Sequence, residues 1–499
     1  MDHNLYNLLA SRFSGAAARP ALVDADGRGP SYGDLDGLAA RFAAVLHRRG
    51  VEAGDRVVAQ VEKSVAAVAL YLACLRRGAV LVPLNTAYTD AEVDRFLADA
   101  QPRVFVGCRG RGEASVSMEL LGADEGEGLW AEALVSAPLA AITPRGRDDL
   151  AAIVYTSGTT GVSKGAMLSH GNLASNALAL HDLWGFHRED VLVHALPVFH
   201  VHGLFVALHC AMLSAATTIF LPRFDAAEVR RLLPRATVMM GVPTFYTRLL
   251  ALEGFGRDDC RSMRLFISGS APLPAETWKE FERRTGAPIL ERYGMTETGM
   301  ITSNPLDGER VPGTVGFALP EVEVRVRRED GALAATGEAG VVEVRGPNVF
   351  CGYWRMPEKT AEDFRDDGFF VTGDIGVLDA EERLTLVGRA RDLIISGGLN
   401  VYPKEIEEVL DAAPGVTESA VVGVPDADFG EAVVAVVVRA AGATVTADEL
   451  AQTVRARLAR FKHPRRFVFV DELPRNAMGK VQKNVLRERF AKAEPGQLA

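Results

Sequence analysis

Short apolar runs alternate with amphipathic segments along the first half of the chain. Each run has the length of a buried strand, and the segment that follows it has the period of a helix. The predicted strands lie at 56–61, 79–83, 104–107, 152–156, 191–195, 217–221, 237–240 and 265–267. Strands that alternate with helices predict an α/β fold.

The pattern changes near residue 310 and again near residue 391. After residue 310, apolar alternation is interrupted by Gly, Pro and Asp turns, which predicts a β-rich unit with strands at 322–326, 340–345 and 384–387. The last part of the chain predicts an α+β lobe with helices at 405–412 and 447–460 and strands at 419–424 and 432–438. We therefore expect two domains, with a boundary at 388–392. They are a large N-terminal α/β domain of several subdomains, residues 1–390, and a small mobile C-terminal α+β domain, residues 391–499.

The composition excludes several classes of protein. The chain has 499 residues, of which 48% are apolar and 24% are charged. This profile is typical of a globular protein of about two to four domains and not of a disordered or fibrous one. The formal net charge of −10 provides no overall attraction for nucleic acid or anionic lipid, so we expect neither as a partner. An anionic substrate must then be bound by local cations.

The cysteines, the N-terminal segment and the longest apolar stretch favour a cytoplasmic protein. The five cysteines lie far apart without a C-x-x-C pair, which predicts buried thiols in a reducing compartment and no zinc ribbon or disulfide framework. The N-terminal segment lacks the basic and apolar regions of a secretory signal. The apolar stretch 204–221 contains His209 and ends in a β-branched run, so we expect a buried helix and a strand rather than a membrane span.

A loop rich in glycine and hydroxyl side chains follows the predicted strand at 152–156. Its glycines allow consecutive backbone N–H groups to converge on an anion, its hydroxyls add donors, and Lys164 adds a positive charge. The loop is not a Walker A motif, because Lys164 is preceded by Ser163 and followed by Gly165. We interpret it as a polyphosphate cradle; the alternative is a flexible surface loop. The predicted cradle consists of Thr156, Ser157, Gly158, Thr159, Thr160, Gly161 and Lys164.

Six further motifs follow the loop in a fixed order. They are PVFHVHG at 197–203, SGSAP at 268–272, ERYGMTET at 291–298, TGD at 372–374, GRARD at 388–392 and PRNAMGK at 474–480. With the loop, they resemble the acyl-adenylate-forming superfamily of acyl-CoA synthetases, beetle luciferases and peptide-synthetase adenylation domains. The resemblance covers residues from about 5 to 490, and the ordered set of motifs is far more specific than any one of them.

The resemblance implies a reaction in two halves, with ATP and CoA as co-substrates and Mg²⁺ as cofactor. A carboxylate attacks the α-phosphate of ATP and releases pyrophosphate, and the acyl group then passes to the thiol of CoA. Lys480 is implied as the catalytic cation, brought to the site when the small domain docks, and His200 as a residue that steadies the reacting carboxylate. Arg391 is implied as the hinge. Both halves need cations near the phosphates.

The same resemblance assigns the nucleotide site. Glu297 is the implied Mg²⁺ ligand, and Thr296 donates to phosphate. Tyr293 offers an aromatic face to adenine, while Asp374 and Arg389 bind the ribose. The nucleotide-binding residues beyond the phosphate loop are Ala271, Pro272, Glu291, Tyr293, Gly294, Met295, Thr296, Asp374 and Arg389.

The acid pocket carries an unusual residue. Arg292 stands where relatives that take bulky acids have glycine, and a buried guanidinium needs an anionic partner. With His202 and Ser270, Arg292 resembles the pocket of malonyl-CoA synthetases, which implies malonate as substrate, with methylmalonate also accepted. The alternative is that Arg292 turns outward and pairs with Glu291 or Glu297.

CoA binding is less sharply marked. The resemblance places the turn Ser396, Gly397 and Gly398 at the pantetheine channel, and basic residues that could meet the CoA phosphates are Arg248, Lys462, His463 and Arg465. A solvated surface is the other interpretation of this basic cluster. Other functions left open are a ligase for another short acid, an enzyme that loads a carrier-protein thiol, and a non-catalytic nucleotide sensor. We expect a monomer or weak homodimer.

Overall fold

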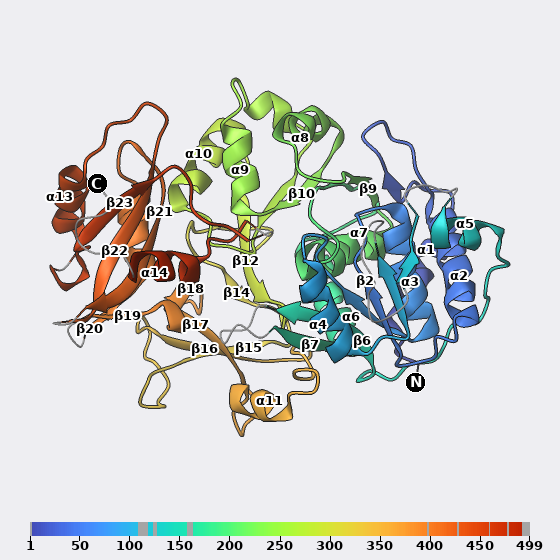
Figure 1. Cartoon of the computed structure of the whole chain (residues 1–499). Coiled ribbons are helices and arrows are strands. Elements are labelled where there is room, and N and C mark those ends of the chain that lie inside the picture. Colours follow the sequence, from blue (N-terminus) through green and yellow to red (C-terminus); the bar gives the residue numbers. More distant parts are fainter. Residues whose placement is uncertain are drawn as a thin grey trace.

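The fold is taken from a computed structural model, shown in Figure 1. It describes residues 2–107, 118–122, 127–156, 163–396, 399–426, 429–458, 460–476 and 479–491. Five residues of the predicted phosphate cradle, Ser157, Gly158, Thr159, Thr160 and Gly161, lie outside the described residues, as do Gly397 and Gly398.

A six-stranded sheet forms one half of the N-terminal domain. Its strand order is β5-β4-β2-β3-β6-β7, and its central strands pair in parallel. Apart from Arg56 at the start of β2, the residues of β2, β3 and β4 are apolar and buried, as expected for a parallel sheet covered by helices. The strands are β2 (Arg56–Ala59), β3 (Val80–Pro83), β4 (Val104–Gly107), β5 (Met118–Leu120), β6 (Leu150–Thr156) and β7 (Lys164–Ser169).

An eight-stranded sheet forms the other half, in the order β1-β9-β8-β10-β11-β12-β13-β14. Its first six strands pair in parallel, and the last two join antiparallel. The strands are β1 (Leu22–Val23), β8 (Val191–His194), β9 (Thr217–Phe220), β10 (Val238–Gly241), β11 (Leu265–Ser268), β12 (Ile289–Met295), β13 (Gly299–Ser303) and β14 (Phe317–Ala318). The predicted α/β fold is confirmed.

Helices cover these two sheets in the blue to green part of Figure 1. They are α1 (Leu5–Ser14), α2 (Tyr32–Arg48), α3 (Val65–Arg77), α4 (Asp90–Ala100), α5 (Gly128–Val135), α6 (His170–Leu183), α7 (Leu208–Ser214), α8 (Ala226–Leu232), α9 (Pro243–Leu250) and α10 (Ala275–Thr285). Side-chain oxygens cap the N-termini of several of them, as Ser31 does for α2 and Ser64 for α3.

The predicted β-rich unit is a four-stranded antiparallel sheet, β15-β16-β17-β18. It consists of β15 (Glu323–Arg327), β16 (Gly340–Arg345), β17 (Phe370–Leu378) and β18 (Leu384–Arg389), with α11 (Pro357–Asp363) before β17. Strand β17 was not predicted, because Thr372, Gly373 and Asp374 interrupt its apolar pattern.

The C-terminal domain is the α+β lobe expected from the sequence, on one side of the molecule in Figure 1. Its five strands have the order β20-β19-β22-β21, with β23 beside β22. Two helices pack on one face of the sheet and one on the other. The elements are β19 (Ile394–Ser396), β20 (Leu399–Val401), α12 (Pro403–Asp411), β21 (Val416–Asp426), β22 (Gly430–Arg439), α13 (Ala447–Arg457), β23 (Arg466–Val470) and α14 (Lys483–Ala491).

The long apolar stretch forms the predicted helix and strand. A π-helical turn over His202–Ala207 leads into α7 and then into β9. In the part of the chain that the structure describes, no helix combines the length and apolar character needed to cross a bilayer. Cys74, Cys210 and Cys260 are buried as expected, whereas Cys351 is exposed, because it lies in a surface segment after β16. The prediction that every thiol is buried is therefore wrong at Cys351.

Candidate active site

The β6–β7 hairpin holds the two described ends of the predicted phosphate loop. Thr156 ends β6 and faces Lys164 at the start of β7, with Thr156 Oγ1 donating to the Lys164 carbonyl at 3.4 Å. Lys164 Nζ lies 3.7 Å from Asp363 Oδ2 and 4.1 Å from the centre of the Tyr353 ring. The lysine is thus held at the mouth of the loop by two residues that the sequence analysis missed, because neither lies in a recognised motif.

The β12–β13 hairpin carries the ERYGMTET motif. Gly294 allows the two strands to approach, since a Cβ at this position would lie 2.1 Å from the Gly299 carbonyl oxygen. Glu297 lies in the connecting turn, is 5% exposed, and accepts a hydrogen bond from the Tyr353 hydroxyl at 3.2 Å. Burial raises the pKa of Glu297, which is the behaviour of a carboxylate with too little positive charge around it.

Tyr293, Asp374 and Arg389 meet at the end of the four-stranded sheet. Asp374 on β17 is paired in register with Arg389 on β18, and Arg389 Nε lies 2.6 Å from Asp374 Oδ1. The Tyr293 hydroxyl donates to the other carboxylate oxygen. Burial and the nearby Asp374 carboxylate hold the pKa of Tyr293 well above its usual value, so the hydroxyl stays a donor. The adenine and ribose residues of the prediction are therefore one connected cluster.

Lys480 is turned toward this cluster by the C-terminal domain. A Cβ added at Gly479 would lie 3.6 Å from Thr244 Oγ1 at the start of α9, so the lysine turn reaches the N-terminal domain. Burial of the ammonium and the Arg389 guanidinium lower the pKa of Lys480 to about 8. The charges of Asp374, Arg292 and Glu297 also act on it. The structure thus brings Lys480 to the predicted nucleotide site.

Arg292 is buried and forms no ion pair with an acid among the described residues. It is 4% exposed, and its Nε and Nη2 atoms have no hydrogen-bond partner among the described residues. Burial lowers its pKa to about 9. Space for the guanidinium comes from Gly269, where a Cβ would lie 2.4 Å from Arg292 Cζ. The alternative in which Arg292 pairs with Glu291 or Glu297 is not observed; Glu291 accepts from the Gly313 N–H instead, at 3.1 Å.

His202 and Ser270 line the same pocket. His202 Nδ1 lies 3.1 Å from Ser270 Oγ, while His202 Nε2 is buried without a partner in the described part of the chain. Burial and the Arg292 charge lower the pKa of His202, which keeps the imidazole neutral. Ser270 has a φ of 70°, a left-handed conformation that is uncommon for serine and recurs at functional sites. The buried hydroxyl of Ser268, which was not predicted, also lacks a partner among the described residues.

His200 lies two residues before His202 on the same turn. Its Nδ1 accepts a hydrogen bond from the His202 backbone N–H at 3.3 Å. Burial and the charges of Lys480 and Arg292 lower the pKa of His200 to about 3. The imidazole is therefore neutral at pH 7 and can donate through Nε2.

The remaining predicted residues are placed less tightly. Ala271 and Pro272 follow Ser270 in an irregular segment before α10, and Thr296 and Met295 lie partly buried at the β12–β13 turn. Arg391 lies in a short 3₁₀ turn, Ala390–Asp392, between β18 and β19. Ser396 ends β19 and is buried.

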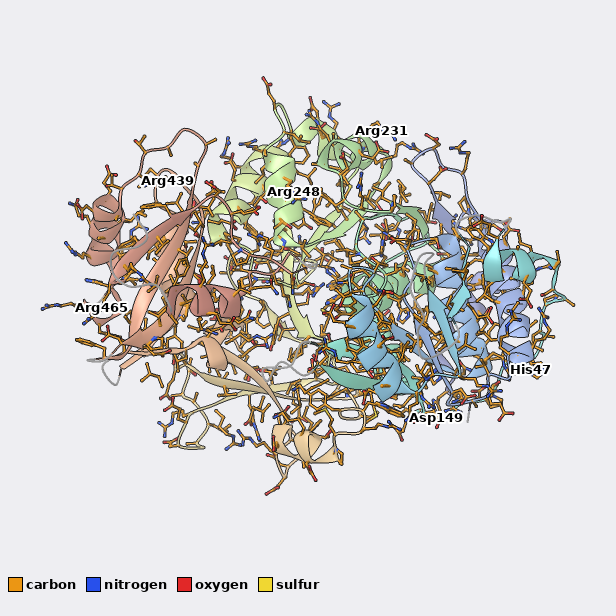
Figure 2. All side chains as sticks on the ribbon, in the orientation of Figure 1. His47, Asp149, Arg231, Arg248, Arg439 and Arg465 are labelled. Carbon is orange, nitrogen blue, oxygen red and sulfur yellow. The ribbon has the colours of Figure 1, made fainter. Side chains whose placement is uncertain are left out.

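The predicted CoA-binding cations do not converge. Figure 2 shows Arg248 on α9 and Arg465 at the far edge of the C-terminal domain. Arg465 lies 3.8 Å from Asp426 and packs over the Phe429 ring. Lys462 pairs with Glu405, and His463 Nε2 contacts the Leu458 carbonyl. In this arrangement of the domains, three of these four residues are bound to partners within their own domain.

Comparisons with known proteins agree with this geometry. Residues 10–354 match the AMP-binding enzyme family, and residues 405–480 match the AMP-binding enzyme C-terminal domain. The ATP-bound structure of MatB from Rhodopseudomonas palustris is 53% identical to this chain, covers 99% of both chains and gives a TM-score of 0.95.

Two curated relatives act on different acids. An indoleacetate–CoA ligase from Aromatoleum aromaticum is 38% identical over 93% of this chain and 93% of its own length. A mitochondrial malonate–CoA ligase from Mus musculus is 36% identical over 96% of this chain and 90% of its own length. The chain therefore belongs to the AMP-binding enzymes of the acyl-CoA synthetase superfamily.

Proposed function

We propose that the protein is an ATP-dependent malonate–CoA ligase that forms malonyl-CoA through a malonyl-adenylate and releases AMP and pyrophosphate. The observation that carries this assignment is Arg292, a buried guanidinium whose Nε and Nη2 have no partner among the described residues. Family membership does not fix the acid, since relatives activate both aromatic acids and malonate. The identity of the acid must therefore follow from the residues around Arg292.

A diacid supplies what the pocket lacks. Arg292 Nε and Nη2 and His202 Nε2 are buried without a hydrogen-bond partner among the described residues. A second carboxylate on the substrate would accept hydrogen bonds from them. Loss of one partner from a buried ion pair costs about 2–5 kcal/mol, which is enough to select malonate over acetate. Methylmalonate is a further substrate, because one added methyl group changes binding by only about 1–3 kcal/mol.

The first half-reaction needs positive charge on the transferring phosphoryl group. We assign this role to Lys480, which approaches from the C-terminal domain, and to Lys164, which stands at the end of the phosphate loop. His200 donates to the reacting carboxylate as a neutral imidazole and orients it toward the α-phosphate. Cations placed in advance stabilise the charge that develops on pyrophosphate as it leaves.

Glu297 fits the role of Mg²⁺ ligand. It is a buried carboxylate whose pKa is raised by burial, and a single protein carboxylate is enough where phosphates supply the other oxygens. Thr296, the preceding residue in the turn, would donate to the same phosphates. When bound, the ion would neutralise phosphate charge.

The second half-reaction requires a rearrangement of the C-terminal domain. We propose that residues 1–390 and 391–499 move as two units about Arg391, which lies in the short turn between β18 and β19. Rotation would withdraw Lys480 and bring the turn after Ser396 to the pantetheine arm of CoA. The contacts of Lys462, His463 and Arg465 inside their own domain support no phosphate-binding role in the present arrangement.

Product analysis with a panel of acids tests the proposal. Purified enzyme is incubated with ATP and Mg²⁺ and with acetate, propionate, malonate, methylmalonate or succinate, first without and then with CoA. We expect pyrophosphate release and malonyl-CoA formation to be highest with malonate. Pyrophosphate without free thioester would identify an enzyme that loads a protein thiol, and no pyrophosphate with any acid would identify a nucleotide sensor.

A further inference from the structure

Lys63 contacts a buried histidine, and within the part of the chain that the structure describes it forms no ion pair with a carboxylate. Lys63 follows β2 and directly precedes Ser64, the N-cap of α3. Its Nζ lies 2.7 Å from His194 Nδ1 and donates to the His194 carbonyl at 2.8 Å. It also lies 4.3 Å from the centre of the Phe220 ring. Burial holds the pKa of Lys63 well below its usual value.

This arrangement gives His194 one defined tautomer. The Gly203 carbonyl can only accept, so the proton of the neutral imidazole is on His194 Nε2, and Nδ1 accepts from Lys63. His194 Nε2 then donates to the Gly203 carbonyl at 2.9 Å. His194 is fully buried, and burial together with the Lys63 charge lowers its pKa, which keeps the ring neutral.

Gly203 belongs to the turn that carries the two pocket histidines. It lies in the π-helical turn His202–Ala207, and its carbonyl also accepts from the Leu208 backbone N–H. A Cβ at Gly203 would lie 2.0 Å from the Pro197 carbonyl oxygen, so the segment from Pro197 to Gly203 closes tightly on itself. The position of His200 and His202 is therefore tied to the Gly203 carbonyl.

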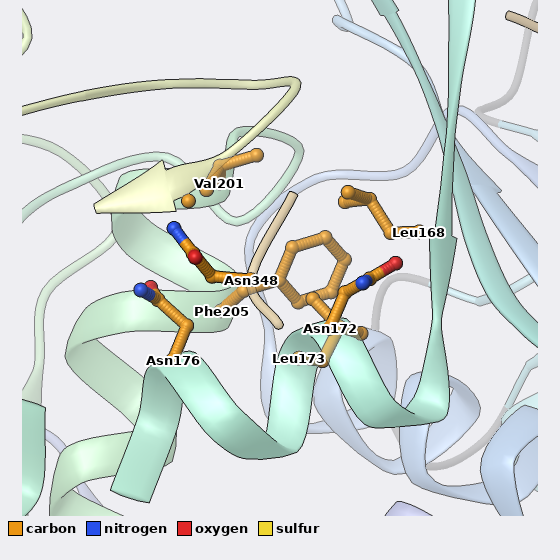
Figure 3. Close-up of a pocket in the computed structure, with 8 residues that line it drawn as sticks. Leu168, Asn172, Leu173, Asn176, Val201, Phe205 and Asn348 are labelled. Atoms are coloured by element: carbon orange, nitrogen blue, oxygen red, sulfur yellow. The ribbon is translucent and has the colours of Figure 1, made fainter. Parts of the chain in front are cut away.

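The turn also packs into the apolar core of the domain, through Val201, Leu204 and Phe205 among others. Val201 and Phe205, on either side of Gly203, line a small internal cavity with Asn176 and Asn348 (Figure 3). One of the Asn348 side-chain atoms, Oδ1, is buried there without a partner among the described residues. Side chains beside a cavity forgo part of their packing contacts, so the polar contact at Gly203 adds to the positioning of the turn.

We propose that Lys63 and His194 are positioning residues that hold the histidine turn, and through it His200 and His202, in the geometry required for acid binding. Neither residue touches the substrate. Retaining a buried ammonium without a carboxylate is unfavourable unless its N–H groups are used, and here they orient the imidazole that supports the turn. The identity of the acid rests on the proposed function, but the relay from Lys63 through His194 to Gly203 does not.

Two substitutions of His194 separate the contacts of the relay. In His194→Gln the side-chain amide nitrogen reaches the place of Nε2 and can still donate to Gly203. In His194→Asn the amide group reaches only the place of Nδ1, so it can still accept from Lys63, but the Gly203 carbonyl loses its side-chain donor and keeps only the Leu208 backbone N–H. Steady-state KM values for the acid and for ATP are measured for both, with whichever acid the wild type activates best.

The relay predicts a difference between the two variants. His194→Asn should raise the KM for the acid about tenfold, the effect of losing one buried hydrogen bond, and leave the KM for ATP within about twofold. His194→Gln should stay within about threefold of the wild type for both. Equal effects of the two variants, or parallel increases of the KM for acid and ATP, would overturn the proposal.

Substitution of Lys63 gives an independent test that does not depend on how well the His194 variants fold. Lys63→Met retains the length of the side chain and removes its donors, whereas Lys63→Arg retains donors. We expect Lys63→Met to raise the KM for the acid about tenfold and Lys63→Arg to raise it less. An unchanged KM for the acid in Lys63→Met would contradict the relay. If the wild type prefers an acid other than malonate, the proposed function fails. The His194 and Lys63 variants still test the relay, because they are assayed with the acid that the wild type prefers.

Discussion

Arg292 can occupy the end of the acid pocket only because residue 269 has no side chain. A Cβ at position 269 would lie only 2.4 Å from Arg292 Cζ, so the side chain of any other residue there would overlap the guanidinium. Two residues of the SGSAP segment thus act on one pocket: Gly269 gives space to the cation, and Ser270 holds His202. In the proposed acid site, the small size of Gly269 is therefore as necessary as the charge of Arg292.

Gly269→Ala should therefore displace Arg292 and weaken malonate binding. Overpacking of a buried site costs about 1–3 kcal/mol, so we expect kcat/KM for malonate to fall by about tenfold or more, with the KM for ATP nearly unchanged. Gly37→Ala is the matched control, because a Cβ at Gly37 meets no atom within 4 Å. Steady-state kinetics with both substrates make the comparison; equal behaviour of the two variants would contradict the role of Gly269.

The lowered pKa of Lys480 predicts a pH dependence of adenylation. A lysine with a pKa of about 8 loses its charge as the pH rises through that value, so kcat/KM for pyrophosphate release should fall above about pH 8. Arg292, with a pKa of about 9, adds to the loss only at higher pH. Lys480→Arg should move the decline to higher pH whatever its absolute rate, and an unchanged profile would exclude Lys480 as the titrating group.

At the scale of elements, the strands that carry chemistry were the hardest to predict. The buried parallel strands β2, β3, β4 and β8 follow from continuous apolar runs, because both faces of such strands are covered. Strands β13 and β17 carry buried polar residues, Thr302 and Asp374 among them, that break the apolar pattern. Their polarity is what the site requires, so a pattern of burial alone could not reveal them.

The same limit applies to the candidate site. The motifs indicated Lys480, Arg292, His202 and Ser270, and the structure brings these residues to one region. Tyr353 and Asp363 were missed because contact between positions some two hundred residues apart leaves no local signal. The basic residues at 462–465 show the converse: their clustering in sequence did not indicate that each has its own partner in the folded domain.

At the scale of the whole molecule, the C-terminal domain lies against the N-terminal domain, with Lys480 near the predicted nucleotide site. Gly479 lies beside Thr244, since an added Cβ would come within 3.6 Å of Thr244 Oγ1, and Lys404 on α12 donates to the Leu386 carbonyl on β18 at 2.5 Å. Both contacts join the two domains and would break if the C-terminal domain rotated. The connecting turn, Ala390–Asp392, is the short segment about which such a rotation would occur.

Fixing this turn should separate the two half-reactions. Proline restricts φ to about −65° and is tolerated in the first turn of a helix, where Arg391 lies here. We therefore expect Arg391→Pro to retain pyrophosphate release with malonate and to lose most malonyl-CoA formation, while Arg391→Ala retains both. Single-turnover assays of each half-reaction measure this, and equal loss of both in Arg391→Pro at unchanged thermal stability would argue against a hinge at Arg391.

The specificity constants of wild-type enzyme and Arg292→Gly for malonate and propionate test the central claim most directly. Removal of the guanidinium should lower kcat/KM for malonate by at least about 30-fold, the equivalent of about 2 kcal/mol, and should leave the KM for ATP and the melting temperature nearly unchanged. Propionate, which has no second carboxylate, should lose little or gain. An unchanged kcat/KM for malonate in Arg292→Gly would contradict the account.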